Sequence, residues 1–186
     1  MLTKQSINAA LKIIGRTGFG GVTASAPNAL LALRYILKEY PAKPGSAERI
    51  LAELKRQKLV HISNESNRWH FVLSPAGIHR LQQVIIDEVT IPHPKSWDGK
   101  WRMVAFDVPT SQSKQRKYFT AHLQRLGFLM LQKSMWVYPF PCFEQVEQVA
   151  GHYNVLRYCT MVEINRLDEL SAKRLLRHFS SVLGKI

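Results

Sequence analysis

Two prolines, Pro92 and Pro94, divide the sequence into halves with different hydrophobic periodicity. Proline lacks a backbone N–H and disfavours helix in the residue before it, so the segment 89–100 (VTIPHPKSWDGK) cannot form a continuous helix. We expect an extended linker here, with a separately packed domain on each side. The predicted divisions are a first domain at 1–88, the linker at 89–100, a second domain at 101–165 and a C-terminal helix at 166–186.

The first domain begins with three predicted helices. Apolar residues recur at helical spacing over 4–16, which indicates the first helix. Asn28 is a good N-cap for a second, strongly apolar helix that should end near 40–41. Ser46 is a good N-cap for the third helix, whose buried stripe is formed by Ala47, Ile50, Leu51 and Leu54.

A hairpin and a fourth helix follow. Strands with alternating polarity are predicted at 59–63 and 69–73, and the polar residues 64–68 (NESNR) form the expected hairpin tip. Ser74 and Pro75 then suit the N-cap and the first position of a helix. Three helices, a two-stranded wing and a closing helix are the order of a winged helix-turn-helix domain.

This order gives the third helix and the hairpin a role in DNA binding. Arg49 and Arg56 lie on one face of the third helix, and guanidinium groups can read guanine bidentately in the major groove. Polar hairpin residues can contact phosphates or the minor groove. The alternative is that Arg49 and Arg56 only solvate a surface helix. The candidate DNA-binding residues are Lys43, Arg49, Lys55, Arg56, Lys58, Asn64, Ser66, Asn67 and Arg68.

The same stretch carries a recognisable motif. ERILAELKRQKLVHISNESNRWHFVLSPAGIHRL resembles the recognition helix, wing and L-[ST]-x-x-G-x-x-x-L ending of many bacterial winged-helix repressors. That resemblance implies a winged-helix fold and says nothing about the DNA sequence that is bound.

The second half alternates strands and helices. Strands are predicted at 101–106, 128–132, 134–138 and 157–164, and helices at about 111–126, 142–153 and 168–183. Ser111 or Ser113 is the expected cap of the first of these helices, and Gly127 is its expected C-terminal stop. The order βαββαβ followed by a helix predicts a ferredoxin-like domain with a C-terminal helix. The fold class is therefore α+β.

The net charge of the chain indicates which kind of partner it binds. The chain has 26 Lys and Arg against 13 Asp and Glu, a formal net charge of +13, and the excess is shared by both halves. Such a charge favours a polyanion, and double-stranded DNA is the expected partner. Two cysteines without a C-x-x-C pair indicate a reducing compartment, and no apolar run is long enough to span a membrane. We expect a cytoplasmic protein.

A series of short motifs in the second half indicates the function more closely. Trp97-Asp98-Gly99-Lys100-Trp101-Arg102, Phe106-Asp107-Val108-Pro109, the basic helix with Arg116, Leu126-Gly127-Phe128 and 132–137 (QKSMWV) occur in this order. The string resembles the central domain of PaaX-like transcriptional regulators, which is itself similar to the Cas-two endonuclease of CRISPR spacer acquisition. The resemblance implies a regulator, expected to be a repressor, that acts as a homodimer on a palindromic site.

The resemblance is not complete. PaaX-type repressors are longer and have a further C-terminal region implicated in effector response, so no acyl-CoA inducer is carried over and any small-molecule effector is left open. The seven histidines form no H-x-x-x-H pair, and glycine-rich phosphate-binding motifs are absent from the sequence. No cofactor is expected.

Asp107 separates two functions. In Cas-two proteins an aspartate at this motif position, one from each protomer, holds a divalent metal, and two carboxylates suit Mg²⁺. The resemblance thus offers an alternative, a Mg²⁺-dependent endonuclease or CRISPR-adaptation subunit with Asp107 as catalytic and metal-binding residue. The favoured interpretation is that Asp107 ends a strand and accepts hydrogen bonds from the following turn, which Pro109 holds in place.

Overall fold

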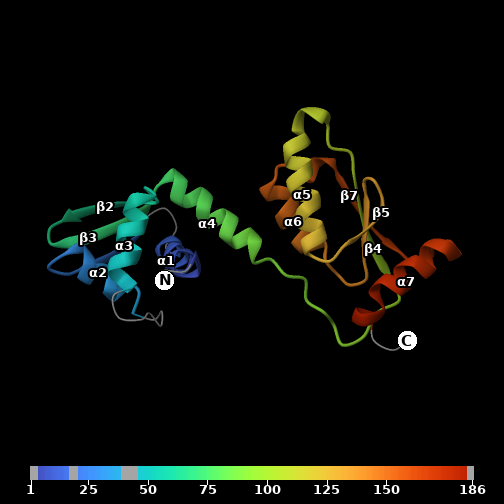
Figure 1. Ribbon diagram of the computed structural model, residues 1–186, viewed down its shortest axis with the longest axis horizontal. Coiled ribbons are helices and arrows are strands. Elements are labelled where there is room, and N and C mark those ends of the chain that lie inside the picture. The colour runs from blue at the N-terminus through green and yellow to red at the C-terminus, as the bar shows by residue number, and fades with distance from the viewer. Residues whose placement is uncertain (1–3, 17–20, 39–45, 184–186) are drawn as a thin grey trace. The chain divides into compact units, whose positions relative to one another are not determined.

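The computed structural model describes residues 4–16, 21–38 and 46–183 (Figure 1). The chain has a mixed α+β fold and separates into two compact units, unit 1 at residues 1–87 and unit 2 at residues 88–186. Lys43 lies outside the described residues. Among the described helices, none is both long and apolar enough to cross a lipid bilayer.

Unit 1 has four helices and a three-stranded antiparallel sheet in its described part. The chain order is α1 (Lys4–Gly15), β1 (Val22–Ser25), α2 (Ala29–Ile36), α3 (Ser46–Arg56), β2 (Val60–Glu65), β3 (Arg68–Leu73) and α4 (Pro75–Asp87). The strands are ordered β1-β3-β2. Their shared core is fully buried at Leu11, Ile14, Leu33, Ile50, Leu54 and Phe71.

Two cap predictions in unit 1 are confirmed and one is wrong. Asn28 caps α2, because its Oδ1 accepts a hydrogen bond of 2.9 Å from the N–H of Leu31. Ser74 caps α4 and accepts from the N–H of Gly77 at 3.0 Å. Ser46 is the first residue of α3 rather than its N-cap. The α2 helix also ends at Ile36, earlier than predicted.

The hairpin is longer than its sequence suggests. Glu65 pairs with Arg68, so only Ser66 and Asn67 form the turn. Both have positive φ, 48° and 62°, which is the type I′ geometry that matches the twist of a two-stranded hairpin. The strand β1 was not predicted. It pairs with β3 on the edge opposite β2.

Unit 2 contains a four-stranded antiparallel sheet with strand order β5-β6-β4-β7. Its strands are β4 (Trp101–Phe106), β5 (Leu129–Gln132), β6 (Met135–Tyr138) and β7 (Cys159–Ile164), and its helices are α5 (Ser113–Arg125), α6 (Phe143–His152) and α7 (Glu169–Leu183). The order β4-α5-β5-β6-α6-β7 is the predicted βαββαβ, and α7 is the predicted C-terminal helix.

The helices of unit 2 cover both faces of its sheet. Phe106 of β4 meets Phe119 of α5 edge to face, with ring centroids 5.3 Å apart. Trp101 points to the opposite face, as alternation along a strand requires, and meets Phe179 of α7 at 5.8 Å. In Figure 1, α5 and α6 accordingly lie on one side of the sheet and α7 on the other.

The ends of α5 show what local sequence determines. Gly127 adopts φ +91° and closes the helix with two hydrogen bonds, Gly127 N–H to Gln124 O and Phe128 N–H to Leu123 O. This is the Schellman motif that glycine after a helix favours, so that prediction is confirmed. The predicted N-cap is wrong, because Ser111 lies in a 3₁₀ turn (Thr110–Gln112) and Ser113 is already helical.

Residues 88–100 form neither helix nor strand, and they pack against unit 2. Ile91 is buried, and the imidazole Nε2 of His93 lies 2.7 Å from the hydroxyl of Tyr138. The indole of Trp97 packs on that of Trp101 at 4.7 Å. The segment therefore follows the surface of unit 2 as part of its packing.

Candidate nucleic-acid interface

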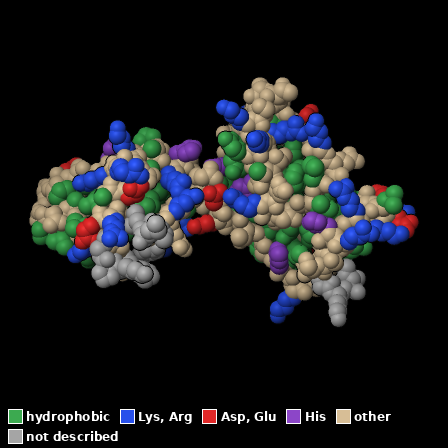
Figure 2. All heavy atoms as spheres, in the orientation of Figure 1, with side chains coloured by type: hydrophobic (Ala, Val, Ile, Leu, Met, Phe, Trp, Pro, Cys, Tyr) green, Lys and Arg blue, Asp and Glu red, His purple; other side chains and the backbone are tan. Residues whose placement is uncertain are grey.

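The α3 helix stands on the core of unit 1 and presents a polar face. Ala47, Ile50 and Leu54 are buried, and Leu51 is half-buried, so the predicted stripe is confirmed. Arg49 and Arg56 are exposed, and a separation of seven residues places them on the same face of the helix. Figure 2 shows Lys and Arg side chains interspersed with Asp and Glu over this unit.

Arg56 is held by Glu53, one turn earlier in α3. The carboxylate of Glu53 accepts from Nε of Arg56 at 2.8 Å and from its Nη2 at 2.5 Å. These hydrogen bonds, with a further one from Gln57, lower the pKa of Glu53 to about 2. A guanidinium has five N–H groups, so the Nη1–Nη2 edge of Arg56 still has donors for another acceptor. Glu53 thus orients Arg56 without using all its donors.

A second acidic residue fixes the start of α3 against α2. Glu48 forms an ion pair with Arg34 of α2, and the pKa of Glu48 is lowered, chiefly by a backbone hydrogen bond and also by Arg34. Arg34 is therefore engaged by the protein itself. Arg49, on the neighbouring position of α3, has no ion-pair partner among the described residues.

Lys55 and Lys58 lie at the other end of α3, on a different part of the surface from Arg49. With His61 of β2 they line a shallow hollow of about 400 Å³. Lys58 adopts φ +53°, and its carbonyl accepts a 2.6 Å hydrogen bond from the hydroxyl of Ser74. The chain therefore turns sharply from α3 into β2 here, with both lysines exposed.

The tip of the hairpin is polar and exposed at every position from Asn64 to Arg68. Ser66 and Asn67 form the turn, and Asn64 lies in β2 opposite Trp69. Arg68 faces Glu65 across the hairpin. The tip therefore carries one cation beside one carboxylate and offers mainly amide and hydroxyl groups.

Ser74 and Gly77, at the start of α4, hold the hairpin against the helices. Ser74 bridges two segments, since it caps α4 and bonds the carbonyl of Lys58. A Cβ placed on Gly77 would lie 2.0 Å from the carbonyl oxygen of Leu59, so only glycine allows α4 to pass this close to the backbone before β2. Leu81 packs against Gly15 of α1.

Most of the predicted residues lie on α3, in the turn after it or in the β2–β3 hairpin. We call this set the α3–wing surface: Arg49, Lys55, Arg56, Lys58, Asn64, Ser66, Asn67 and Arg68. Sequence reasoning missed the bond between Arg56 and Glu53, although the i, i+3 spacing of the pair is a usable signal. It also missed His61 beside the lysines.

Asp107 lies at the end of β4 and is exposed. Its backbone N–H donates to the carbonyl of Tyr158 at 3.1 Å, which ties β4 to the 3₁₀ turn before β7. Within the described residues its carboxylate accepts no hydrogen bond from the following turn, so that part of the structural interpretation is wrong. The described residues also hold no group of three or more His, Cys, Asp or Glu side chains placed to bind a metal ion.

The tryptophan-rich string has a structural explanation. Arg102 is buried. Its guanidinium donates hydrogen bonds to both carboxylate oxygens of Asp98, at 2.8 and 2.5 Å, and to the carbonyls of Lys100 and Pro139. The hydrogen bond from Arg102 lowers the pKa of Asp98 to about 2. Gly99 adopts φ +77°, which glycine tolerates best. These residues anchor the segment before β4.

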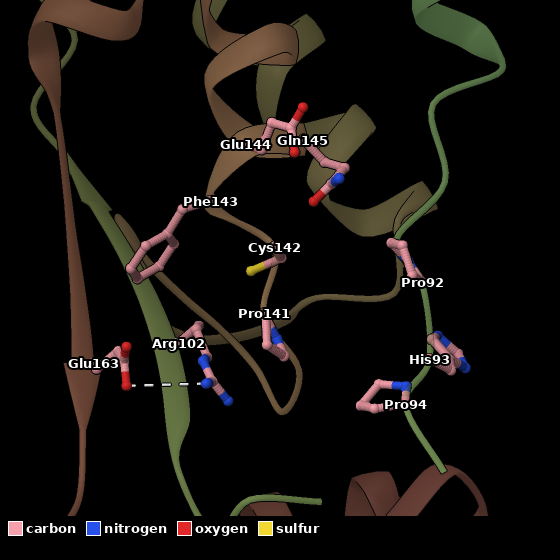
Figure 3. A pocket seen from close by; sticks show the side chains of 10 residues that line it. All are labelled: Pro92, His93, Pro94, Arg102, Pro141, Cys142, Phe143, Glu144, Gln145 and Glu163. Atoms are coloured by element: carbon pink, nitrogen blue, oxygen red, sulfur yellow. Dashed lines mark ion pairs between the residues drawn. The ribbon is translucent and has the colours of Figure 1, made fainter. Parts of the chain in front are cut away.

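A pocket of about 620 Å³ lies beside this anchor (Figure 3). Its lining includes Pro92, His93, Arg102, Cys142 and Glu163. Burial raises the pKa of the Cys142 thiol to about 12, so the thiol stays protonated. Glu163 lies 3.9 Å from Nη2 of Arg102, and both terminal nitrogens of this guanidinium already donate to other protein oxygens. The polar groups that line the pocket thus mainly stabilise the fold through contacts within the protein.

Comparisons with known proteins agree with this description of unit 2. In a scan of protein-family models, the PaaX protein central Cas2-like domain matches residues 94–176, which run from the segment before β4 into α7. A search of curated proteins found no significant match. The match includes the Asp98–Arg102 anchor, the whole four-stranded sheet and Asp107. Residues 94–176 are therefore similar to the PaaX central Cas2-like domain, which supports a PaaX-like protein.

Proposed function

We propose that this protein is a DNA-binding transcriptional regulator, acting as a repressor, that binds a palindromic DNA site as a homodimer. In this proposal residues 1–88 are a winged helix-turn-helix DNA-binding domain, and residues 101–165 are a ferredoxin-like dimerisation domain. Residues 89–100 connect the two domains, and residues 166–186 are a C-terminal helix. No cofactor is required, and the protein acts in the cytoplasm.

The observation that carries the proposal is the exposed basic face of α3. Arg49 and Arg56 project from a helix whose opposite stripe is locked into the core of unit 1, so the helix can approach DNA as a rigid body. An α-helix fits the major groove, where an arginine can donate two hydrogen bonds to O6 and N7 of guanine. The Glu53 carboxylate pre-orients Arg56 for such a contact.

The hairpin supports the same role. Its type I′ turn makes a stiff, narrow projection whose Asn64, Ser66 and Asn67 side chains are exposed. Amide and hydroxyl groups suit phosphate and minor-groove contacts, which position a protein on the duplex. Lys55, in the last turn of α3, and Lys58, between α3 and β2, line the same hollow, where two cations add affinity without adding sequence preference.

The sheet of unit 2 offers a surface for a second copy of the chain. Val162 of β7 lies opposite Met103 of β4, on the face of the sheet that also carries α7, and Val162 is 36% exposed. Met103 and Met135 on the same face are half-buried. Strand β7 also has one unpaired edge. A two-fold dimer through this face would present two α3–wing surfaces to one duplex.

Selection of DNA from a random pool tests this proposal. The full chain, incubated with random duplexes at moderate salt, is expected to enrich an inverted repeat over successive rounds. Sedimentation of the selected complex is expected to give two chains per duplex. Failure to enrich any sequence, or enrichment of a single asymmetric site by one chain, would contradict the proposal.

A second function is favoured by one observation, the exposed Asp107 within the Cas2-like match. In this alternative, two copies of Asp107 bind Mg²⁺ across a dimer and activate a water for phosphodiester hydrolysis. The test is incubation with DNA and RNA in Mg²⁺ or Mn²⁺, with Asp107→Asn as control. Cleavage that the variant lacks would support the nuclease, and equal or absent cleavage by both proteins would exclude Asp107 as its catalytic residue.

A further inference from the structure

A second basic surface lies on unit 2 and shares no residue with the α3–wing surface. Four segments meet at one end of the sheet: the end of β4, the start of α5, the β5–β6 turn and the 3₁₀ turn before β7. They carry five basic side chains and, in Asp107, one acidic side chain. We call the basic set the basic rim: Lys114, Arg116, Lys117, Lys133 and Arg157.

Hydrogen bonds between these segments hold the rim together. Nη2 of Arg116 donates to the hydroxyl of Ser134 at 3.2 Å, which joins α5 to the β5–β6 turn. Ser134 O accepts from the N–H of Phe106 at 3.0 Å, and Tyr158 O accepts from the N–H of Asp107 at 3.1 Å. The amide Nε2 of Gln112 donates to the Tyr158 hydroxyl at 3.1 Å. The rim therefore stands on a fixed framework.

The charges of the rim are left unbalanced. Lys114, Lys117, Lys133 and Arg157 are exposed, and within the described part of the chain none of them forms an ion pair. The start of α5 adds to this, since its first turn has no acidic residue and no side chain caps it. Figure 2 shows Lys and Arg side chains gathered at the end of unit 2 where α5 begins. Like charges on adjoining segments repel one another, so an anionic partner would lower the electrostatic free energy of the protein.

We propose that the basic rim is a second DNA-binding surface, which contacts the phosphate backbone of the duplex without reading its sequence. This inference rests on the proposed function for its choice of partner, because the α3–wing surface brings duplex DNA to the same chain. Lysines on separate segments suit backbone phosphates, and their contribution to affinity falls with salt through counterion release. The side chains expected to contact phosphate are Lys114, Lys117 and Lys133.

The test is the salt dependence of DNA binding by the full chain. The triple variant Lys114→Gln/Lys117→Gln/Lys133→Gln is expected to bind specific and non-specific duplex more weakly by roughly 10-fold or more at low salt. The slope of log K against log salt should become shallower by about 0.9 for each phosphate that the variant no longer neutralises. The ratio of specific to non-specific affinity should stay unchanged.

Two matched variants make the result specific. The triple variant Lys→Arg at the same positions keeps the charge and is expected to bind like the wild type. Arg166→Gln/Lys173→Gln/Arg177→Gln removes the same charge from exposed positions at and before α7 and is expected to bind nearly as well as wild type. Equal loss in the α7 variant, or no loss in the rim variant, would overturn the proposal.

Other outcomes separate this proposal from the proposed function. Arg49→Ala/Arg56→Ala is expected to lose discrimination between sequences while keeping the part of the salt-dependent binding that the rim variant loses. Full discrimination in that variant would count against the α3–wing surface and leave the rim to its own test. Stronger competition by RNA than by duplex of equal length, or no DNA binding by the wild type at low salt, would overturn the rim as a DNA surface.

Discussion

Replacement of Arg49 and Arg56 together by alanine is expected to abolish sequence-specific DNA binding and to leave the fold unchanged. Each bidentate arginine–guanine contact is worth about 1–3 kcal/mol, so loss of both lowers specific affinity by roughly 30-fold to 20,000-fold. The fold is preserved because both side chains are exposed and none of the core rests on them. Fluorescence anisotropy with the selected duplex and with a scrambled duplex measures the change.

The control for this double variant removes the same amount of charge from another part of the protein. Arg166→Ala/Arg177→Ala removes two exposed cations of unit 2 and is expected to bind the selected duplex almost like the wild type. Far-UV circular dichroism and sedimentation should give the same helix content and the same dimer for all three proteins. If Arg49→Ala/Arg56→Ala still discriminates between the two duplexes, α3 does not read DNA.

Gly77→Ala is expected to destabilise unit 1 severely. The added methyl would lie 2.0 Å from the carbonyl oxygen of Leu59 and 3.0 Å from its carbonyl carbon, and neither atom can rotate away as a side chain can. The α4 helix and the start of β2 must separate, which also strains the Ser74 bonds to Lys58 and Gly77. We expect a loss of about 3 kcal/mol in the free energy of unfolding.

Hydrogen exchange followed by mass spectrometry checks this prediction unit by unit. Faster exchange in Gly77→Ala should be confined to unit 1, above all to α4 and β2. Gly151→Ala is the matched control, because Gly151 lies in α6 and a Cβ there meets no atom within 4 Å. Alanine favours helix over glycine by about 1 kcal/mol, so this variant should be as stable as wild type or more so. Equal stability of Gly77→Ala and wild type would show that the close approach has no role.

Local signals in the sequence predicted most of the elements. The mainly apolar segment Trp101–Phe106 and the glycine after α5 indicate where a strand runs and where a helix ends, and both were correctly placed. Asn28 and Ser74 act through hydrogen bonds to residues three positions away, so their caps could be predicted as well. By contrast, β1 is four residues long and is stabilised by pairing with β3, far away in the sequence.

The candidate site was predicted as a set of residues but not as a geometry. A polar tip was expected for 64–68, yet the two-residue turn depends on Ser66 and Asn67 both accepting positive φ, without the usual Asn-Gly signal. The basic start of α5, Lys114–Lys117, could be named from the sequence as a source of phosphate contacts. Its position beside the β5–β6 turn could not, because Arg116 meets Ser134 only through the order of strands and helices in unit 2. Pairing between distant segments is a property of the fold.

The most direct test of the proposed function is a change in the spacing of the selected DNA site. If one dimer presents two α3–wing surfaces, insertion of about 5 base pairs between the half-sites turns one half-site by half a helical turn, out of reach of the second surface. Affinity should then fall to that of a single half-site. Insertion of a full turn, about 10 base pairs, should restore affinity only if the connection between the units can extend. Unchanged affinity after the half-turn insertion, with two chains still bound, would contradict the account.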